Sequence, residues 1–83
     1  MKSERDYGKI LKKTAANIKK YRRIAGLTQE DMVGYGFNYR HYQKIESGTY
    51  SPNLRTLHRV ANAFGISLKD LFLLELNSLN FLN

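Results

Sequence analysis

The chain of 83 residues contains no cysteine and no tryptophan, and it has no long hydrophobic run. Without cysteine it can form no disulfide, no thiolate metal site and no cysteine nucleophile. The longest apolar stretch, Leu71 to Leu76, includes Glu75 and is far too short to cross a bilayer. The basic N-terminus lacks the apolar segment of a signal peptide. We therefore expect no disulfide and no membrane span, and a cytoplasmic location fits both.

Alternation of polar and apolar residues is also missing, because no segment keeps that pattern over four or more positions. The sequence therefore predicts no β-strand. Apolar residues recur instead with the period of helices, in five segments. A chain this short supports one core, so we expect an all-α, compact five-helix domain over residues 1–83.

Positive charge is abundant but unevenly placed. The formal net charge is +7, and residues 1–27 carry nine of the 14 basic residues against two of the seven acidic ones. A small basic domain points first to nucleic acid and next to an anionic membrane surface. RNA-binding domains usually present aromatic residues on a sheet, and membrane-surface helices need Trp or Phe beside Lys. Neither pattern is present, which favours DNA. The Lys-rich first part of the chain could also be a solvated surface without a partner.

Capping residues divide the first half of the chain into two helices. Asp6 is predicted to cap a first helix that runs to Ile24 and ends at Gly26. Its apolar side holds Leu11, Thr14, Ala15, Ile18, Tyr21 and Ala25, with Arg22 as a basic exception. Thr28 is predicted to cap a short second helix. Met32 and Val33 form the inner side of this helix, and Gly34 and Gly36 end it.

A third short helix follows over residues 38–46. Asn38 is a preferred N-cap, and Phe37 and Tyr42 have the spacing of a hydrophobic staple. Gly48 supplies the left-handed residue that ends helices. One side of this helix can pack, through Tyr42, Ile45 and Glu46. The other carries Arg40 and Lys44, flanked by His41, Gln43 and Ser47; such side chains suit guanine, adenine and phosphate groups, although many surface helices are polar for no such reason.

The last two helices carry most of the apolar residues. Asn53 is predicted to cap residues 54–64, ended by Gly65, and Ser67 with Asp70 caps a fifth helix. The inner side of the fourth consists of Leu54, Leu57, Val60, Ala61 and Phe64. In the fifth, we expect Leu68, Phe72, Leu76, Leu79 and Leu82 to close the core. A second face, with Leu71, Leu74, Ser78 and Phe81, is the predicted homodimer contact.

Motifs spread over most of the chain resemble the DNA-binding domain of lambda-repressor and Cro-type helix-turn-helix regulators, the xenobiotic-response-element family. The matching residues are Ile18-x-x-Tyr21-Arg22, Gly26-Leu27-Thr28-Gln29-Glu30, Lys44-Ile45-Glu46-Ser47-Gly48, Ser51-Pro52-x-Leu54-x-Thr56-Leu57, Ala61-x-Ala63-Phe64-Gly65-Ile66-Ser67 and Leu68-x-x-Leu71-Phe72. The match covers residues 14–72, leaving a basic extension at 1–13 and an apolar end at 73–83. This chain departs from the family in the short second helix and in Tyr42, which stands where a buried Ile or Val is usual.

The resemblance implies a helix-turn-helix at helices two and three, with residues 38–46 as the recognition helix in the major groove. It implies that Arg22 and Glu46 form a structural ion pair. Base edges would be read by Tyr39, Arg40, His41, Gln43 and Lys44. Phosphates would be contacted by Gln29, Asn38, Lys19, Arg23 and Arg55.

The expected function is therefore that of a sequence-specific regulator that binds double-stranded DNA as a homodimer on a near-palindromic operator. The alternative is an antitoxin-type or other protein-binding regulator that also binds DNA. In neither role do we expect the protein to be an enzyme or to bind a cofactor or a small-molecule ligand. His41 and His58 lie on different predicted helices without further ligands, so no metal site is expected. Ser47, Thr49 and Ser51 have no partner base for nucleophilic catalysis.

Overall fold

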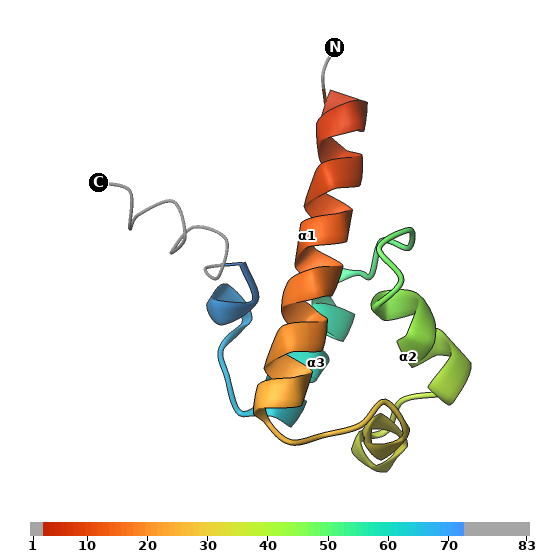
Figure 1. Ribbon diagram of the computed structural model, residues 1–83, viewed down its shortest axis with the longest axis vertical. Helices are drawn as coiled ribbons and strands as arrows, with labels where there is room; N and C mark the ends of the chain where they lie inside the picture. The colour runs from red at the N-terminus through yellow and green to blue at the C-terminus, as the bar shows by residue number, and fades with distance from the viewer. Residues whose placement is uncertain (1–2, 73–83) are drawn as a thin grey trace.

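The computed structural model describes residues 3–72 of the chain. Its elements are α1 (Ser3–Ile24), the 3-10 helix η1 (Glu30–Tyr35), α2 (Tyr39–Ile45) and α3 (Leu54–Phe64). A helical turn follows at residues 68–72. The described part of the chain contains no strand, so the predicted all-α fold of five helices is confirmed. In the view of Figure 1, α2 and the turn at 68–72 lie on opposite sides of α1.

The first helix begins earlier than its sequence predicts. α1 starts at Ser3, so Asp6 lies within it and the prediction that Asp6 caps the helix was wrong. Glu4 and Arg5 are good helix formers, and nothing before Asp6 interrupts the helix. The other end agrees with the prediction, because α1 stops at Ile24 and Gly26 adopts a left-handed φ of 78°.

The second helix has a different geometry from the expected one. Thr28 forms a reciprocal capping box, in which its amide donates to Asp31 and its hydroxyl accepts from the Asp31 amide at 3.1 Å. The residues that follow form a 3-10 helix, in which neighbours are about 120° apart. Met32 is therefore fully buried while Val33 is 51% exposed. The prediction that Val33 belongs to the inner side was wrong.

The caps of the next two helices agree with the sequence. Asn38 accepts a hydrogen bond from the His41 amide at 3.0 Å, and Asn53 accepts one from the Thr56 amide at 2.8 Å. Gly65 ends α3 at a φ of 74°. Gly48 also has a positive φ, of 81°, but it comes after α2 has already ended at Ile45.

One core joins these elements. It contains residues of α1, η1, α2, α3 and the last turn, among them Ile18, Met32, Phe37, Tyr42, Ile45, Leu57, Val60, Ala61, Phe64 and Leu71. Besides Val33, two predicted inner residues of the first four helices are exposed and lie outside it. Leu54 is 66% exposed at the first position of α3, and Ala25 is exposed because α1 ends before it.

The last described turn is rotated relative to its predicted orientation. Ser67 and Asp70 form the expected capping box, through Ser67 N to Asp70 at 3.0 Å and Asp70 N to Ser67 Oγ at 3.3 Å. Leu71 is completely buried, and its carbonyl accepts a hydrogen bond from buried Asn17 Nδ2 at 2.8 Å. The assignment of Leu71 to a dimer contact was therefore wrong, and Phe72, predicted to lie inside, is 39% exposed. The remaining predicted contacts, Leu74, Ser78 and Phe81, lie outside the described residues.

Candidate nucleic-acid interface

Helix α2 is anchored by its inner side. Tyr42 and Ile45 are almost completely buried, and the Phe37 and Tyr42 rings meet edge to face at 5.6 Å, which is the predicted staple. Arg59 of α3 lies over the Phe37 ring at 4.5 Å, and its Nη2 donates to the Gly36 carbonyl at 3.0 Å. The turn between η1 and α2 is therefore attached to α3 at both the ring and the backbone.

The outer side of α2 is a continuous polar surface. Tyr39, Arg40, Gln43, Lys44 and Ser47 line one shallow concavity. Arg40, Gln43 and Lys44 are exposed, and Tyr39 is half-buried. The structure thus brings four of the five residues predicted to read bases onto one surface, which we call the α2 outer face.

His41, the fifth of those residues, does not line this concavity. It is half-buried, and its Nε2 is hydrogen-bonded to the Tyr50 hydroxyl at 3.1 Å. The two rings also meet edge to face, at 5.5 Å. His41 therefore connects α2 to the loop that follows it.

The residues predicted to contact phosphate are in two different situations. Lys19, Arg23, Asn38 and Arg55 are exposed, although the Asn38 side chain is also the cap of α2. Gln29 is half-buried, and its Nε2 donates to Glu46 Oε1 at 3.0 Å. Its side-chain amide is thus already bonded inside the protein.

Arg22 and Glu46 form the ion pair that the resemblance implied. Arg22 Nε donates to Glu46 Oε2 at 2.6 Å and Nη2 to Oε1 at 3.2 Å, while Nη1 donates to the Leu27 carbonyl at 2.8 Å. The two side chains are only 8% and 3% exposed. The Tyr42 hydroxyl donates to Glu46 Oε2 at 2.5 Å, which satisfies this unusual buried tyrosine. Glu46 therefore links α1, the start of η1 and α2.

The electrostatics of this network follow from its contacts. Burial by itself disfavours the charge of Glu46, but hydrogen bonds from Arg22, Tyr42 and Gln29 outweigh it and lower the pKa of Glu46. The hydrogen bond to Glu46 raises the pKa of Arg22 against the opposing effect of burial. Burial, reinforced by Glu46, raises the pKa of the Tyr42 hydroxyl. Glu46 and Arg22 are therefore both charged at neutral pH, and Tyr42 is a neutral donor.

Sequence reasoning missed several of these contacts. Tyr42 and Glu46 are four residues apart on one helix, a spacing that could have suggested their bond. Nothing in the sequence relates Gln29 to Glu46, Asn17 to the Leu71 carbonyl, or His41 to Tyr50. These contacts depend on how the elements pack, and local patterns do not contain that information.

Residues 3–72 offer neither a metal-binding cluster nor a membrane-spanning helix. No three His, Asp or Glu side chains gather there in an arrangement that could hold a metal ion. No helix in the same range is both long and apolar enough to span a membrane.

Comparison with known proteins identifies the family. The sequence model of the helix-turn-helix domain family matches residues 15–76. An uncharacterized HTH-type transcriptional regulator of Methanocaldococcus jannaschii is 36% identical over 59 residues, which cover 70% of this chain and 89% of the relative. Another of Methanothermobacter thermautotrophicus is 37% identical over 60 residues, covering 70% and 87%. One of Sinorhizobium fredii is 34% identical over 61 residues, covering 72% and 79%. No solved structure matches the chain significantly. With its capped helices, its short η1–α2 connection and this match over most of its length, the chain belongs to the helix-turn-helix domain family.

Proposed function

We propose that the protein is a transcriptional regulator that binds double-stranded DNA sequence-specifically, as a lambda-repressor/Cro-type member of its family. Residues 38–46, which comprise α2 and its caps, enter the major groove with the α2 outer face toward the base edges. The observation that carries this proposal is the division of α2 into a buried side and an exposed side rich in donors. The names of the relatives as HTH-type transcriptional regulators support it. The expected compartment is the cytoplasm.

Individual roles follow from position. Arg40 reads a base through its guanidinium, Gln43 and Tyr39 contact neighbouring base edges, and Lys44 contacts a base or the adjacent phosphate. Exposed Lys19, Arg23 and Arg55 contact the DNA backbone. Gln29 contributes to phosphate binding by its position at the start of η1 and not by its side-chain amide, because that amide is bonded to Glu46. His41 supports the helix through Tyr50 more than it reads bases.

The test begins with selecting bound sequences from a pool of random duplexes, which defines a preferred site. Arg40→Ala should then weaken binding to that site by about 1–3 kcal/mol and relax the preference at one base pair. Lys69→Ala is the matched control, because it removes one exposed positive charge from the turn at 68–72, across α1 from α2 in Figure 1. If Arg40→Ala and Lys69→Ala enrich the same sequences with equal affinity, the α2 outer face does not read DNA.

The active form in this proposal is a homodimer on a near-palindromic operator, because two-fold dimers of helix-turn-helix units read two half-sites about one DNA turn apart. Leu74, Ser78 and Phe81 remain the proposed contacts, without Leu71, which is buried in the core. Sedimentation at micromolar concentration tests this, with Leu74→Lys as the variant. A monomeric wild-type protein, or a fully dimeric Leu74→Lys variant, would refute the proposed contact.

A further inference from the structure

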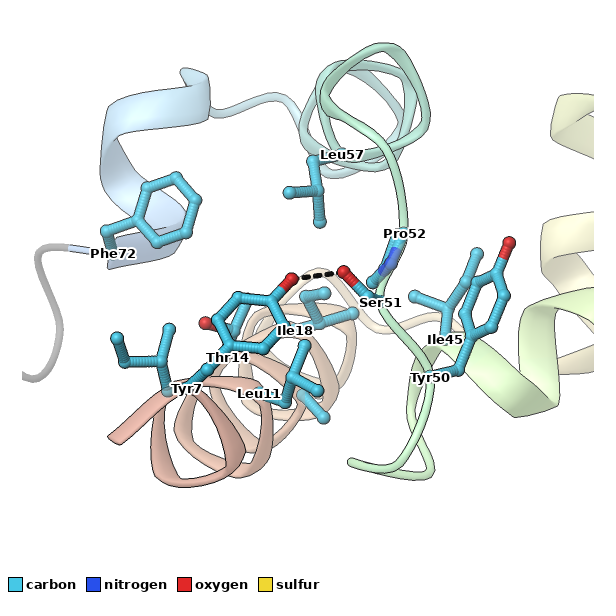
Figure 2. A pocket seen from close by; sticks show the side chains of 12 residues that line it. Tyr7, Leu11, Thr14, Ile18, Ile45, Tyr50, Ser51, Pro52, Leu57 and Phe72 are labelled. Atoms are coloured by element: carbon cyan, nitrogen blue, oxygen red, sulfur yellow. Dashed lines mark hydrogen bonds between the residues drawn. The ribbon is translucent and has the colours of Figure 1, made fainter. Parts of the chain in front are cut away.

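An apolar cavity of about 190 Å³ lies between the first half of α1, the loop after α2, α3 and the turn at 68–72. Its inner wall includes the buried residues Ala15, Ile18 and Ile45. Figure 2 shows that its lining comes from segments far apart in the chain. Because these segments meet only in the folded protein, no local pattern in the sequence indicated the cavity, and no small-molecule ligand was expected.

The lining of this cavity determines which molecules it accepts. None of the twelve described residues that line it is charged. A charged ligand would lose its hydration there without gaining a partner, so the lining favours an uncharged one. Three of the lining side chains, Tyr7, Tyr50 and Phe72, are aromatic. Rings that pack edge to face attract one another beyond the effect of burial, so the lining favours an aromatic ligand over an aliphatic one.

Hydroxyl groups supply the polar part of the wall. The Tyr7 hydroxyl is hydrogen-bonded to the Ser51 hydroxyl (Figure 2), and both residues line the cavity. Each hydroxyl donates one hydrogen bond and accepts others, so this pair has capacity left for one hydroxyl or N–H group of a ligand. Thr14, which is half-buried, adds a third hydroxyl to the lining. A ligand with several polar groups would leave some of them unpaired, which is costly.

The volume limits the ligand to about one ring. A cavity of about 150 Å³ lined by Leu, Ile and Phe binds benzene, whereas drug-sized ligands occupy pockets of about 300–1,000 Å³. At about 190 Å³, this cavity is close to the smaller case. Tyr7 and Ile10, which line it, are 47% and 52% exposed, so the cavity has a mouth at the protein surface.

We propose that this cavity binds a small uncharged aromatic molecule, of one ring and at most one hydroxyl or N–H group. The ring lies between Leu11 and Leu57, and its polar group bonds to the hydroxyls of Tyr7 and Ser51. No residue lines both this cavity and the α2 outer face, so the ligand and DNA occupy different surfaces. Ile45 belongs to the inner wall, so the ligand contacts α2 from its buried side. The inference does not depend on the proposed DNA-binding role.

Nuclear magnetic resonance of the full-length protein tests this site, with phenol as the probe. Nuclear Overhauser contacts between the phenol ring protons and the methyl groups of Leu11, Ile18 and Leu57 report occupation of the cavity itself. Benzoate is the matched control probe, because it has the same ring and carries a carboxylate. The net charge of +7 attracts benzoate to the protein in general, but no charged side chain in the lining compensates its carboxylate.

A pair of variants separates the cavity from the rest of the surface. Thr14→Met fills the cavity from α1 with a flexible side chain. Ala16→Met is the matched control, because Ala16 is an exposed residue of α1 outside the lining. Circular dichroism verifies the folding of both variants. Should Thr14→Met fail to fold, the wild-type contacts and the benzoate control still decide the question.

Phenol should bind saturably and show contacts to the methyl groups of the cavity, and benzoate should show none of them. Thr14→Met should weaken phenol binding several-fold, whereas Ale16→Met should leave it unchanged. Contacts confined to Tyr7 and Ile10 at the mouth, or the absence of saturable binding, would overturn the inference. Equal phenol affinities of the two folded variants would overturn it as well.

Discussion

Replacing Glu46 with alanine removes the acceptor of four hydrogen bonds in one step. Two come from Arg22, one from Gln29 and one from the Tyr42 hydroxyl. The Arg22 guanidinium is left with the Leu27 carbonyl alone, in a position where its side chain is only 8% exposed. The variant therefore leaves a buried charge without its counter-ion, and the buried Tyr42 hydroxyl and the half-buried Gln29 amide without their acceptor.

The expected loss of unfolding free energy follows from that arrangement. Removing one partner of a buried ion pair costs about 3–5 kcal/mol, and the stranded Tyr42 and Gln29 place Glu46→Ala at the upper end of that range. Arg22→Met should cost about 3 kcal/mol, because Glu46 keeps two donors and can also take up a proton. A domain of this length has a free energy of unfolding of roughly 4–12 kcal/mol, so either loss is a large share of it.

Combining substitutions separates the effect of charge from that of packing. Arg22→Met with Glu46→Leu removes both charges and should be more stable than Glu46→Ala. It still leaves the Tyr42 hydroxyl without its acceptor, which costs about 1–3 kcal/mol. Adding Tyr42→Phe should recover part of that loss.

Urea unfolding followed by far-UV circular dichroism measures these differences. Arg23→Met is the matched control, since Arg23 is the exposed neighbour of Arg22 and its replacement should change the free energy of unfolding by no more than about 0.5 kcal/mol. The reasoning fails if Glu46→Ala unfolds within about 1 kcal/mol of that control. It also fails if the double variant is less stable than Glu46→Ala.

Three further expectations concern stability. The pKa of Glu46 is lowered in the folded state, so its contribution is complete above its ordinary pKa of about 4.3 and is lost as the pH falls through the folded value. The difference in unfolding free energy between the wild type and Glu46→Gln should therefore stay constant from about pH 7 to about pH 5 and narrow as the pH falls below about 4.3; a difference that stays constant in acid would contradict this. Asn53→Ala should cost about 1 kcal/mol in thermal unfolding, because the Thr56 amide loses its acceptor; an unchanged midpoint would show that water replaces the cap equally well. Met32→Ala should cost about 2–5 kcal/mol and Val33→Ala less than about 0.5 kcal/mol in urea unfolding. The reverse order would contradict the 3-10 geometry of η1.

The helix ends were largely predictable, because their chemistry is local. Asn38 and Asn53 cap helices through amides three residues away, and Gly65 ends α3 through its own φ. The inner and outer sides of α2 followed from helical periodicity in the same way. Asp6 is the exception, since a capping residue cannot stop a helix from extending toward the N-terminus when the preceding residues also favour it.

The rotation of each helix about its axis and the contacts between elements were not predictable from the sequence. Val33 was assigned to the core on α-helical spacing, and the shorter 3-10 period turned it outward. Leu71 is buried and Phe72 partly exposed, the reverse of the prediction, in a turn whose Leu71 carbonyl is bonded to Asn17, a contact across 54 positions. The sequence also showed Tyr42 where a buried Ile or Val is usual, but Glu46 was not identified as the partner of its hydroxyl.

Glu46 makes its bonds on the inner side of α2, apart from the side chains proposed to read DNA. This carboxylate ties the end of α2 to the rest of the domain from the inside, through Arg22 of α1 and Gln29 at the start of η1. Arg40, Gln43 and Lys44 point away from it, and none of them takes part in that set of bonds. Their identities can therefore change at little cost in folding free energy while the orientation of the helix stays the same. The bonds that orient α2 and the side chains proposed to read bases thus belong to different residues, so the proposed binding preference could be redesigned at these three exposed positions without changes to the core.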